Sequence, residues 1–513
     1  MPLATAPPGA ENLFFTPGSL SLVGDTPASL PAQDALLRNA AGRRISVAAL
    51  FELAATLERG FAMAGFPLAR VVVPVQTLED GGAIRLTAVA GYIESIDVSA
   101  LPVPLHGALQ RRLAPMVGVR HLTQAELERR LLLAGELPGL RLRSTLAAGR
   151  GDGATRLVLD GTFHHSTLSV AVDNRLDRTL GHWQWGASGA LNGTLGAQEQ
   201  LYALARVSPG SRLRILGLGA TLALGEDGLV AGAEWTASTT RAESQPGVVD
   251  ARGQLRRSAL RLSKAVWRGR EATVTAGASI EQVEQWSEAP AFGIDLKRDR
   301  YRAARLVLDG GFGLGSGGWL TGHLSATQGQ GGRDEADAAA SAVPLSRQGA
   351  SPRLRRVSGS LSWSQSLGAP LSRIELSAAG QGTGGRAVFQ SEQFALDAPN
   401  LVSGHVPGSG AVDAGLAMRV EVVGQAAAML QDSGLRLAPY LFAAAGRGSI
   451  ALPTAAEPGR ISLRSQGVGL RVDGAGPLAA GSTTLGIEWA RPQGSRPAAD
   501  NRGRWSASLA MSL

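Results

Sequence analysis

The 513-residue sequence contains no cysteine and only two lysines, Lys264 and Lys297. The absence of cysteine excludes disulfide bonds and thiolate metal sites. Hydrophobic residues make up 44% of the chain, but they never form an apolar run of about 18 residues, the length that predicts a transmembrane helix. Aromatic residues are also few, at 5%. The chain is therefore neither a disulfide scaffold nor a helical membrane protein.

The basic residues are almost all arginine, and the sequence pI is about 10.7. A pI this high invites a nucleic-acid-binding interpretation. The arginines are scattered, however, and no basic stripe with interleaved aromatic residues is present. We therefore favour arginines that line a water-filled lumen, or a simple bias of composition, and predict no nucleic-acid partner.

Motifs of catalysis are also missing. The sequence has no nucleophile elbow, no His-Glu-x-x-His, no phosphate-binding Walker loop and no paired carboxylates at a useful spacing. The adjacent pair His164 and His165 would point to opposite faces of a strand, which is poor geometry for one metal ion. We predict that the protein is not an enzyme and has no cofactor and no metal site.

Residues 162–513 lack any helical period and read as about 16 alternating strands of roughly 10–14 residues, the length of tilted membrane strands. Short turns, such as the one from Gly225 to Gly228, alternate with long connections. The long connections are expected at 241–253, 285–299, 329–352, 384–412, 446–460 and 490–502. This rhythm predicts a transmembrane antiparallel β-barrel, with a soluble β-sandwich as the alternative.

The first part of the chain predicts two small α/β domains, at 11–98 and 99–161. In the first, Ser46 is placed to cap a helix, and β-branched strands follow at about 68–75 and 83–90. In the second, the spacing of Thr123 and Glu126 predicts a capping box at the start of a helix.

The segment 384–412 stands out within the barrel region. Pro399 and Pro407 together with several glycines predict a long loop without regular structure. From Leu416 onward the residues alternate strictly, with Arg419 and Glu421 on the polar face of the expected strand. A long loop therefore leads directly into a strand with one apolar and one polar face.

Two stretches resemble the outer-membrane transporters of two-partner secretion, the ShlB/FhaC/HecB family of haemolysin secretion/activation type. Gly65 and Phe66, followed by Pro74 and Gln76, resemble the first POTRA domain of that family. The residues from 99 to 161 resemble a second POTRA domain. The resemblance implies two periplasmic domains ahead of a barrel.

The loop resembles the inward-folded sixth loop of the same family, which carries a Val-Arg-Gly-Tyr/Phe signature. The matching residues here are Val402, Ser403, Gly404 and His405, so the arginine is replaced by serine. His405 stands at the aromatic position, either as a space-filling ring or as a pH-sensitive contact.

The family's partner motif on the barrel wall, Phe-x-Asp-x-Gly, corresponds to Phe442, Ala444 and Gly446, so the aspartate is missing too. Losing only one member of such an ion pair would leave a buried charge unpaired, at about 3–5 kcal/mol. We therefore expect an in-folded loop that is held by neutral contacts alone and is more mobile than in relatives with the arginine.

By this resemblance the protein is a monomer of the bacterial outer membrane that belongs to a type V secretion pathway. Its POTRA domains would capture an unfolded, secreted β-helical partner of haemagglutinin or haemolysin type, which then passes through the barrel. A passive solute porin and an outer-membrane assembly or insertase scaffold are the alternatives. Residues 1–10 lack the charged and apolar regions of a secretory signal, so we expect the signal peptide to be absent from this chain.

Overall fold

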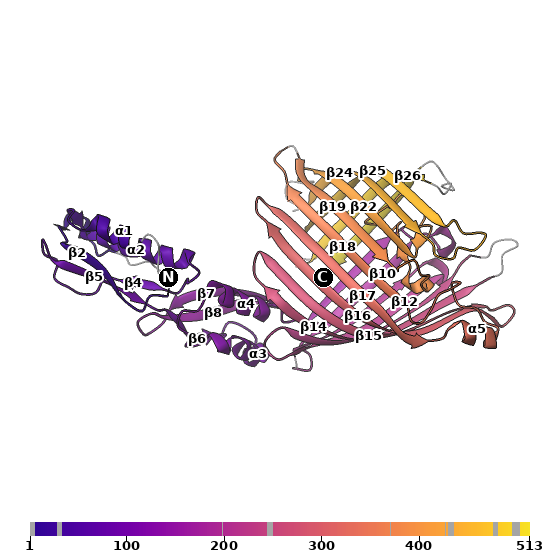
Figure 1. Cartoon of the computed structure of the whole chain (residues 1–513), viewed down its shortest axis with the longest axis horizontal. Helices are drawn as coiled ribbons and strands as arrows, with labels where there is room; N and C mark the ends of the chain where they lie inside the picture. Colours follow the sequence, from indigo (N-terminus) through magenta and orange to yellow (C-terminus); the bar gives the residue numbers. More distant parts are fainter. Residues whose placement is uncertain are drawn as a thin grey trace. The chain divides into compact units, whose positions relative to one another are not determined.

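The computed structural model describes residues 6–27, 33–196, 198–243, 250–369, 371–425, 427–428, 435–475, 481–494 and 503–512. It divides into two compact units, Met1–His164 and His165–Leu513, which are described separately (Figure 1). Among the described helices, none is both long and apolar enough to cross a membrane.

The first small domain is a three-stranded sheet in the order β2-β5-β4 with helices beside it. Its elements are β1 (Phe14–Phe15), β2 (Ser19–Gly24), α1 (Gln33–Ala40), β3 (Ile45–Ser46), α2 (Val47–Met63), β4 (Arg70–Val72) and β5 (Ala83–Val89). The hydroxyl oxygen of Ser46 accepts a hydrogen bond from the N–H of Ala49, so the predicted cap forms. The buried face of α2, including Leu57 and Phe61, then forms a core with Leu86 of the sheet.

The four residues of the expected first-domain motif lie along this sheet and its helix. Gly65 ends α2 in a left-handed conformation, with φ of 94°, and Phe66 packs against the core. Pro74 follows β4 in an irregular segment. The side-chain amide of Gln76 accepts from the N–H of Arg85 at 2.9 Å and donates to its carbonyl at 2.8 Å, so it holds that segment against β5.

The second small domain has a sheet in the order β6-β8-β7. Its elements are β6 (Tyr92–Asp97), α3 (Val103–Leu113), α4 (Gln124–Gly135), β7 (Leu140–Ala148) and β8 (Ala154–Phe163). Thr123 caps α4 through the N–H of Glu126. The structure differs from the predicted division at one strand, because β6 pairs in parallel with β8 and so belongs to the second sheet, not to the range 11–98.

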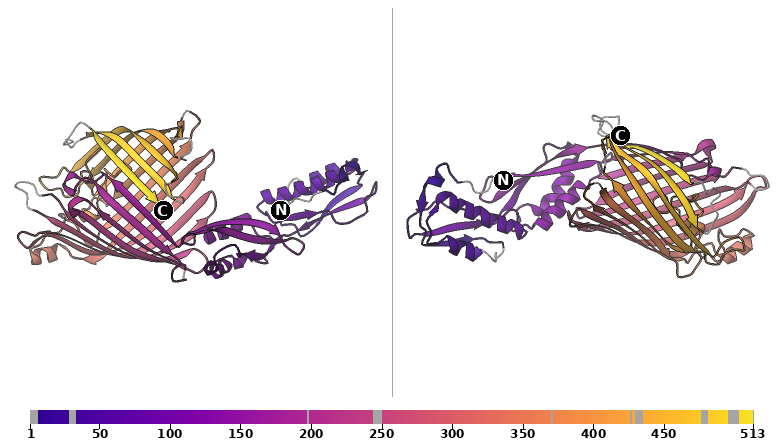
Figure 2. Two further views of the ribbon diagram at one scale, coloured as in Figure 1. Left: turned by 180° about the vertical axis from the view of Figure 1, so that it is seen from behind. Right: turned by 90° about the horizontal axis from the view of Figure 1, so that it is seen from above.

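The second unit is a closed antiparallel barrel of 16 strands, which confirms the predicted fold class (Figure 2). The strands are β9 (Ser166–Asp173), β10 (Gln184–Asn192), β11 (Glu199–Val207), β12 (Leu213–Leu224), β13 (Leu229–Arg241), β14 (Arg252–Arg268), β15 (Ala272–Ala289), β16 (Ile294–Leu314), β17 (Gly318–Gly332), β18 (Arg355–Ser366), β19 (Leu371–Gly382), β22 (Ala414–Gly424), β24 (Arg436–Ser449), β25 (Arg460–Ala475), β26 (Ser482–Gly494) and β27 (Arg504–Ser512). Each pairs with its neighbours in sequence order, and β27 pairs with β9 to close the ring. A two-residue strand, β23 (Ala427–Ala428), pairs with β24 beyond the end of β22.

Several strands are longer than the sequence pattern indicates. The region 285–299, expected to be a long connection, is almost entirely strand, since β15 continues to Ala289 and β16 begins at Ile294. A register shift between Ser287 and Glu288 interrupts the pairing of β15 with β16 in that region but does not end either strand. These strands therefore contain more residues than the 9–11 or so that a tilted membrane crossing needs.

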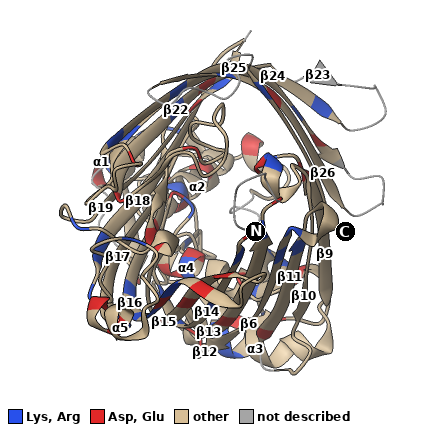
Figure 3. Ribbon diagram, turned by 90° about the vertical axis from the view of Figure 1, so that its right-hand side faces the viewer, with Lys and Arg blue, Asp and Glu red and all other residues tan. Residues whose placement is uncertain are grey.

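The apolar and polar faces of the strands are sorted between the outside and the inside of the barrel. On β24, Leu441 is 61% exposed on the outer surface, whereas Tyr440 and Phe442 are buried inside. On β22 the apolar residues of the alternating pattern face outward, and Arg419 and Glu421 face the lumen. Figure 3 looks at the ring of strands with the charged residues coloured.

Candidate functional site: the loop inside the barrel

The connection between β19 and β22, residues 383–413, folds against the inner wall of the barrel. Val402 and Leu396 are fully buried, in one apolar cluster with Phe442, Ala444 and Leu463 of the wall. A short hairpin of β20 (Phe394–Ala395) and β21 (Ala411–Val412) gives the loop a narrow neck. The loop is therefore a packed structure within the lumen and not a free connection.

The four residues of the expected loop motif all lie against the wall. A Cβ at Gly446 would stand 3.3 Å from a methyl of Val402, so the two predicted motifs do meet at this point. Gly404 comes so close to β25 that a Cβ there would lie 2.9 Å from the Cβ of Ser465, a distance that real Cβ atoms do not reach. A residue with a side chain would therefore push the loop away from the wall.

His405 is 6% exposed, and its Nε2 lies 2.9 Å from the carbonyl oxygen of Arg464. Because a carbonyl can only accept, this nitrogen must carry the proton. The carbonyl of His405 accepts in turn from the guanidinium of Arg504 at 2.8 Å. The loop is thus hydrogen-bonded to β25 through the imidazole of His405 and to β27 through the carbonyl of the same residue.

Ser403 does not meet Ala444 through its hydroxyl but joins a charged cluster, which we call the tip cluster: Ser403, Arg419, Glu421, Tyr440 and Glu488. Arg419 donates to the hydroxyl of Ser403 at 2.9 Å, and that hydroxyl donates to Glu488. Arg419 and Glu488 form a buried ion pair, and Tyr440 also donates to Glu488, at 2.9 Å. The expectation that neutral contacts alone hold the loop is therefore wrong.

The charge missing from the loop is present in the wall. Arg419 lies opposite Ala444 in the register of β22 and β24, and its guanidinium stacks 3.6 Å from the centroid of the Phe442 ring. It also pairs with Glu421 at 2.6 Å. Ala444 leaves room beside Arg419, and no acidic residue is needed at that position because Glu421 and Glu488 supply the negative charge.

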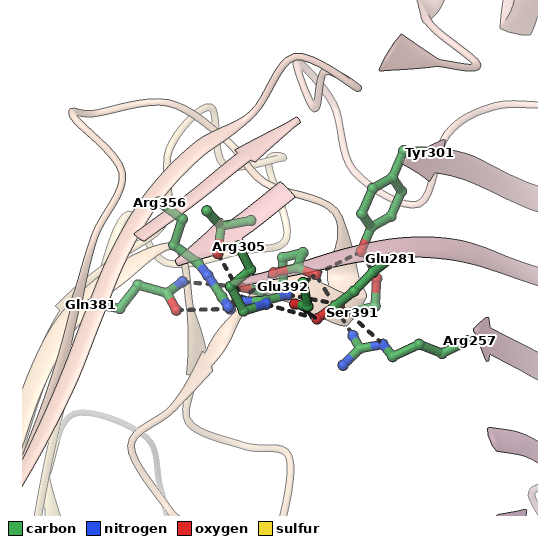
Figure 4. Close-up of polar contacts among 10 residues, drawn as sticks. Arg257, Glu281, Tyr301, Arg305, Arg356, Gln381, Ser391 and Glu392 are labelled. Atoms are coloured by element: carbon green, nitrogen blue, oxygen red, sulfur yellow. Dashed lines mark hydrogen bonds and ion pairs between the residues drawn. The ribbon is translucent and has the colours of Figure 1, made fainter. Parts of the chain in front are cut away.

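A second group of charges surrounds the start of the loop (Figure 4), and we call it the foot cluster: Arg257, Glu281, Tyr301, Arg305, Arg356 and Glu392. The carboxylate of Glu392 is 1% exposed, accepts from the Tyr301 hydroxyl at 2.8 Å and lies 3.0 Å from Arg356. Arg305 and Arg257 lie 3.5 and 3.6 Å from the same carboxylate. Arg305 is shared with Glu281 of β15, at 3.0 Å. One loop carboxylate therefore meets arginines from three strands.

A third contact fixes the end of the loop. Asp413, 1% exposed, pairs with Arg347 at 2.9 Å and accepts from the N–H groups of Val388 and Ala451. Arg347 lies in the connection between β17 and β18 and also pairs with Glu457 of the connection between β24 and β25, at 3.0 Å. The three connections are thus tied together around one carboxylate.

Sequence reasoning missed most of this site. The alternation of the sequence puts Arg419 and Glu421 on a polar face, but it does not indicate which groups they meet. Glu392 lies within the predicted long loop, and no motif around it points to an ion-pair site. Across the described ranges, no three His, Cys, Asp or Glu side chains gather as a metal-ion site. What the site can do chemically is to hold a loop in the lumen by exchangeable polar contacts.

Two family profiles match this chain, one over most of the barrel and one over the first small domain. Residues 158–472 match the family profile described as haemolysin secretion/activation protein ShlB/FhaC/HecB. Residues 15–91 match the ShlB-type POTRA domain. Among curated proteins, no sequence matches this chain.

Many solved structures are similar to this chain, and three of them illustrate the shared fold. CdiB from Escherichia coli is similar with a TM-score of 0.69 and 16% identity, over 100% of this chain and 94% of that one. CdiB from Acinetobacter baumannii is similar with a TM-score of 0.64 and 16% identity, over 98% of this chain and 90% of that one. BamA from Haemophilus ducreyi lacking POTRA domains 1–3 is similar with a TM-score of 0.56 and 12% identity, over 97% of this chain and 100% of that one.

The family profile covers more than half of the chain and includes most of the barrel. Proteins of this family transport proteins across the outer membrane, which places the barrel in that membrane and the POTRA domains in the periplasm. We conclude that the chain belongs to the haemolysin secretion/activation protein family ShlB/FhaC/HecB.

Proposed function

We propose that this protein exports one secreted partner protein of β-helical type through the lumen of its barrel, as a monomer. The partner enters unfolded from the periplasm and folds outside the cell. The observation that carries this proposal is the in-folded loop, which lies against the lumen wall and is held there by the tip and foot clusters. A chain passing through the lumen has to displace this loop.

The contacts that hold the loop suit such a displacement. Once the loop moves, each of its hydrogen bonds can be exchanged for a bond to water or to another polypeptide, so each contributes only about 0.5–1.5 kcal/mol net, or 1.5–3 kcal/mol with a charged partner. The loop carries both donors and acceptors, and a passing unfolded backbone carries the same groups. The partner can therefore replace the loop's contacts one after another.

Capture of the partner is proposed to occur at the edges of the two periplasmic sheets. The strand orders leave β2 and β4 at the edges of the first sheet and β6 and β7 at the edges of the second. In the described residues, β7 pairs only with β8, and much of it is exposed. An unfolded segment can add to such an edge through backbone hydrogen bonds, with little demand on its sequence.

A reversible lock on the loop tests the proposal. Because the natural chain has no cysteine, Gly404→Cys with Ser465→Cys creates a single pair whose Cβ atoms start 2.9 Å apart. A relaxation of several tenths of an ångström reaches the 3.5–4.5 Å or so of a disulfide. We expect the oxidised protein to export no partner, and reduction to restore export.

The matched control is Ser482→Cys with Ser512→Cys, because these hydroxyls lie 2.7 Å apart on adjacent wall strands far from the loop in sequence. Oxidation of this pair should leave export unchanged. If the locked loop still permits full export of the partner, then the lumen is not the route. If the reduced protein also exports no partner but solutes pass at a steady conductance, the porin alternative is favoured.

A further inference from the structure

A basic pocket lies on the outer surface of the barrel, near the ends of β16 and β17 that are remote from their short shared turn. Its volume is about 800 Å³. The charged residues of its lining are Arg298, Arg300, Arg302, Arg333, Asp295 and Asp337. None of these belongs to the tip cluster or the foot cluster.

The alternation of β16 places the arginines outside. Tyr301 is 1% exposed and bonds to the in-folded loop through Ser391, so it faces the lumen. Its neighbours Arg300 and Arg302 must then face outward, and both are exposed. On the neighbouring strand β17, Gly331 stands opposite Arg302, so β17 places no side chain beside that arginine on the outer face.

The hollow is built into the backbone. A Cβ at Gly332 would lie 2.1 Å from the carbonyl oxygen of Arg300, and both glycines have positive φ, 119° at Gly331 and 150° at Gly332. Side chains at these two positions would be strained, and at Gly332 one would also clash. The open space beside the arginines is therefore a fixed feature of the fold.

The pocket keeps positive charge that the protein does not neutralise. Arg298 pairs with Glu284 at 3.0 Å and with Asp295 at 3.7 Å. Arg333 donates only to neutral oxygens, at Arg298, Ser341 and Val343. Within the described residues, neither Arg300 nor Arg302 has an ion-pair partner. Three of the four guanidinium groups can thus bind an external anion.

The position along β16 sets the depth of the pocket in the membrane. The outward residues from Ala304 to Leu314 are apolar, over a stretch as long as the 9–11 residues or so of a tilted crossing. Arginine begins at the next outward position, 302. Trp286 of β15 stands opposite Arg298 in the register, and tryptophan is typical of the membrane interface. The pocket therefore lies at the level of lipid headgroups.

The leaflet follows from the topology. The chain enters the barrel from the periplasmic domains at Ser166, and the turn between β16 and β17 lies at that same end, after an even number of crossings. Arg302 lies at the opposite end of β16. We propose that the pocket binds the phosphorylated sugar headgroup of an outer-leaflet glycolipid.

The chemistry of the lining fits both parts of such a headgroup. Guanidinium forks bind phosphate oxygens two at a time. Asp295, Asp337 and the amides of Gln282 and Gln330 offer partners to sugar hydroxyls, which a free phosphate would not need. A phosphosugar uses the whole lining, whereas inorganic phosphate uses only the arginines.

Binding of lipid A to the purified full-length protein in detergent tests the assignment, measured by native mass spectrometry. We expect Arg300→Gln with Arg302→Gln to weaken lipid A binding at least tenfold. Lipid A without its phosphates should bind the unaltered protein at least tenfold more weakly. Inorganic phosphate at the concentration of the lipid should not displace it.

The matched control is Arg214→Gln. Arg214 is an exposed, outward-facing arginine beyond the apolar residues of β12, and it is not part of the pocket. This variant should bind lipid A like the natural protein. Equal loss in both variants, or no loss in the double variant, would overturn the proposal. Displacement by an equal concentration of inorganic phosphate would assign the pocket to a free anion instead. If the double variant fails to fold, lipid A without its phosphates still tests the proposal on the unaltered protein, because equal binding of the two lipids would overturn it.

Discussion

At the scale of single residues, Ser403 contributes to the anchoring of the loop tip, although it stands where the family resemblance implies an arginine. Its hydroxyl accepts a hydrogen bond from Arg419 and donates one to Glu488, both of which lie on wall strands. The anchoring of the loop tip then rests on a hydrogen bond between a neutral group and a buried ion pair. Such bonds to charged groups contribute about 1.5–3 kcal/mol.

A double-mutant cycle with Ser403→Ala and Glu488→Gln should therefore reveal a coupling of about 1 kcal/mol or more in the free energy of unfolding. Urea titration of the folded barrel measures it. The control cycle pairs Ser403→Ala with Ser465→Ala, since the buried Ser465 hydroxyl has no hydrogen-bond partner among the described residues. A coupling of zero in the first cycle would contradict the geometry of the tip cluster.

Glu392 is the residue whose charge matters most at the foot of the loop. We predict that Glu392→Gln costs about 3–5 kcal/mol of unfolding free energy, because the three partly buried arginines around it lose the buried carboxylate that they share. Glu457→Gln should cost no more than about 1 kcal/mol, because its pair with Arg347 is partly exposed. Equal costs in the two variants would show that Glu392 is not the centre of the foot cluster.

Glu457 is expected to make the stability of the connection between β24 and β25 depend on pH. Hydrogen bonds from the backbone N–H and the hydroxyl of Thr454, helped by Arg347, hold the pKa of Glu457 below its usual range. A carboxyl with a depressed pKa stabilises the fold above its unfolded pKa of about 4.3 and loses that contribution as pH falls through the folded pKa.

The stability difference between the natural protein and Glu457→Gln should therefore be constant from pH 8 to about 6 and shrink as pH falls below about 4. Urea titrations at several pH values measure this difference. A difference that instead changed between pH 6 and 8 would point to another titrating group.

At the scale of elements, the loop is positioned by how closely its tip approaches β25. We predict that Gly404→Ala displaces the tip, because the new Cβ would lie 2.9 Å from that of Ser465. Removing that obstacle with Ser465→Gly in the same protein should return the tip to the wall. Single-channel conductance in planar bilayers reports the change, with a larger and noisier current for Gly404→Ala alone.

The rescue by the second substitution is the decisive comparison. Should the double variant conduct like the single one, steric contact with Ser465 would not be what sets the position of the tip. Gly408→Ala provides a matched control in the same loop, because a Cβ there meets no atom within 4 Å. Its positive φ of 84° adds local strain without a clash.

At the scale of the whole molecule, the two units are separate in their tasks. The barrel closes on itself through β27 and β9 and needs no strand from the periplasmic domains. We predict that deletion of residues 92–163, which hold β6 and the remainder of the second sheet, leaves a folded barrel but abolishes export of the partner.

Heat-dependent migration in electrophoresis verifies the folded barrel, and the amount of partner in the culture medium measures export. Normal export from a correctly inserted barrel without this domain would rule out a need for both domains. A deletion that starts at residue 99 is less informative, because it would leave β6 without its partner strand.

The sequence by itself determined the elements that depend on neighbours along the chain. Alternation with a period of two predicted the wall strands and the single apolar face that Leu416 and Met418 share. Local caps predicted the starts of α2 and α4 at Ser46 and Thr123. The order of these elements, together with the motif residues, was sufficient for the barrel, for the two small domains and for the family resemblance, all of which are confirmed.

Tertiary structure alone decided which distant residues meet. Alternation predicts that Arg419 faces the lumen, but the closure of the ring decides that Glu488, three strands further along, lies within reach. The sequence pattern likewise indicates a strand at β6 without indicating that β8 is its partner. The physical reason is that the side of the strand on which a residue lies is a local property of an extended backbone. Which distant residue it contacts depends instead on register, on strand order and on where a long loop turns inward.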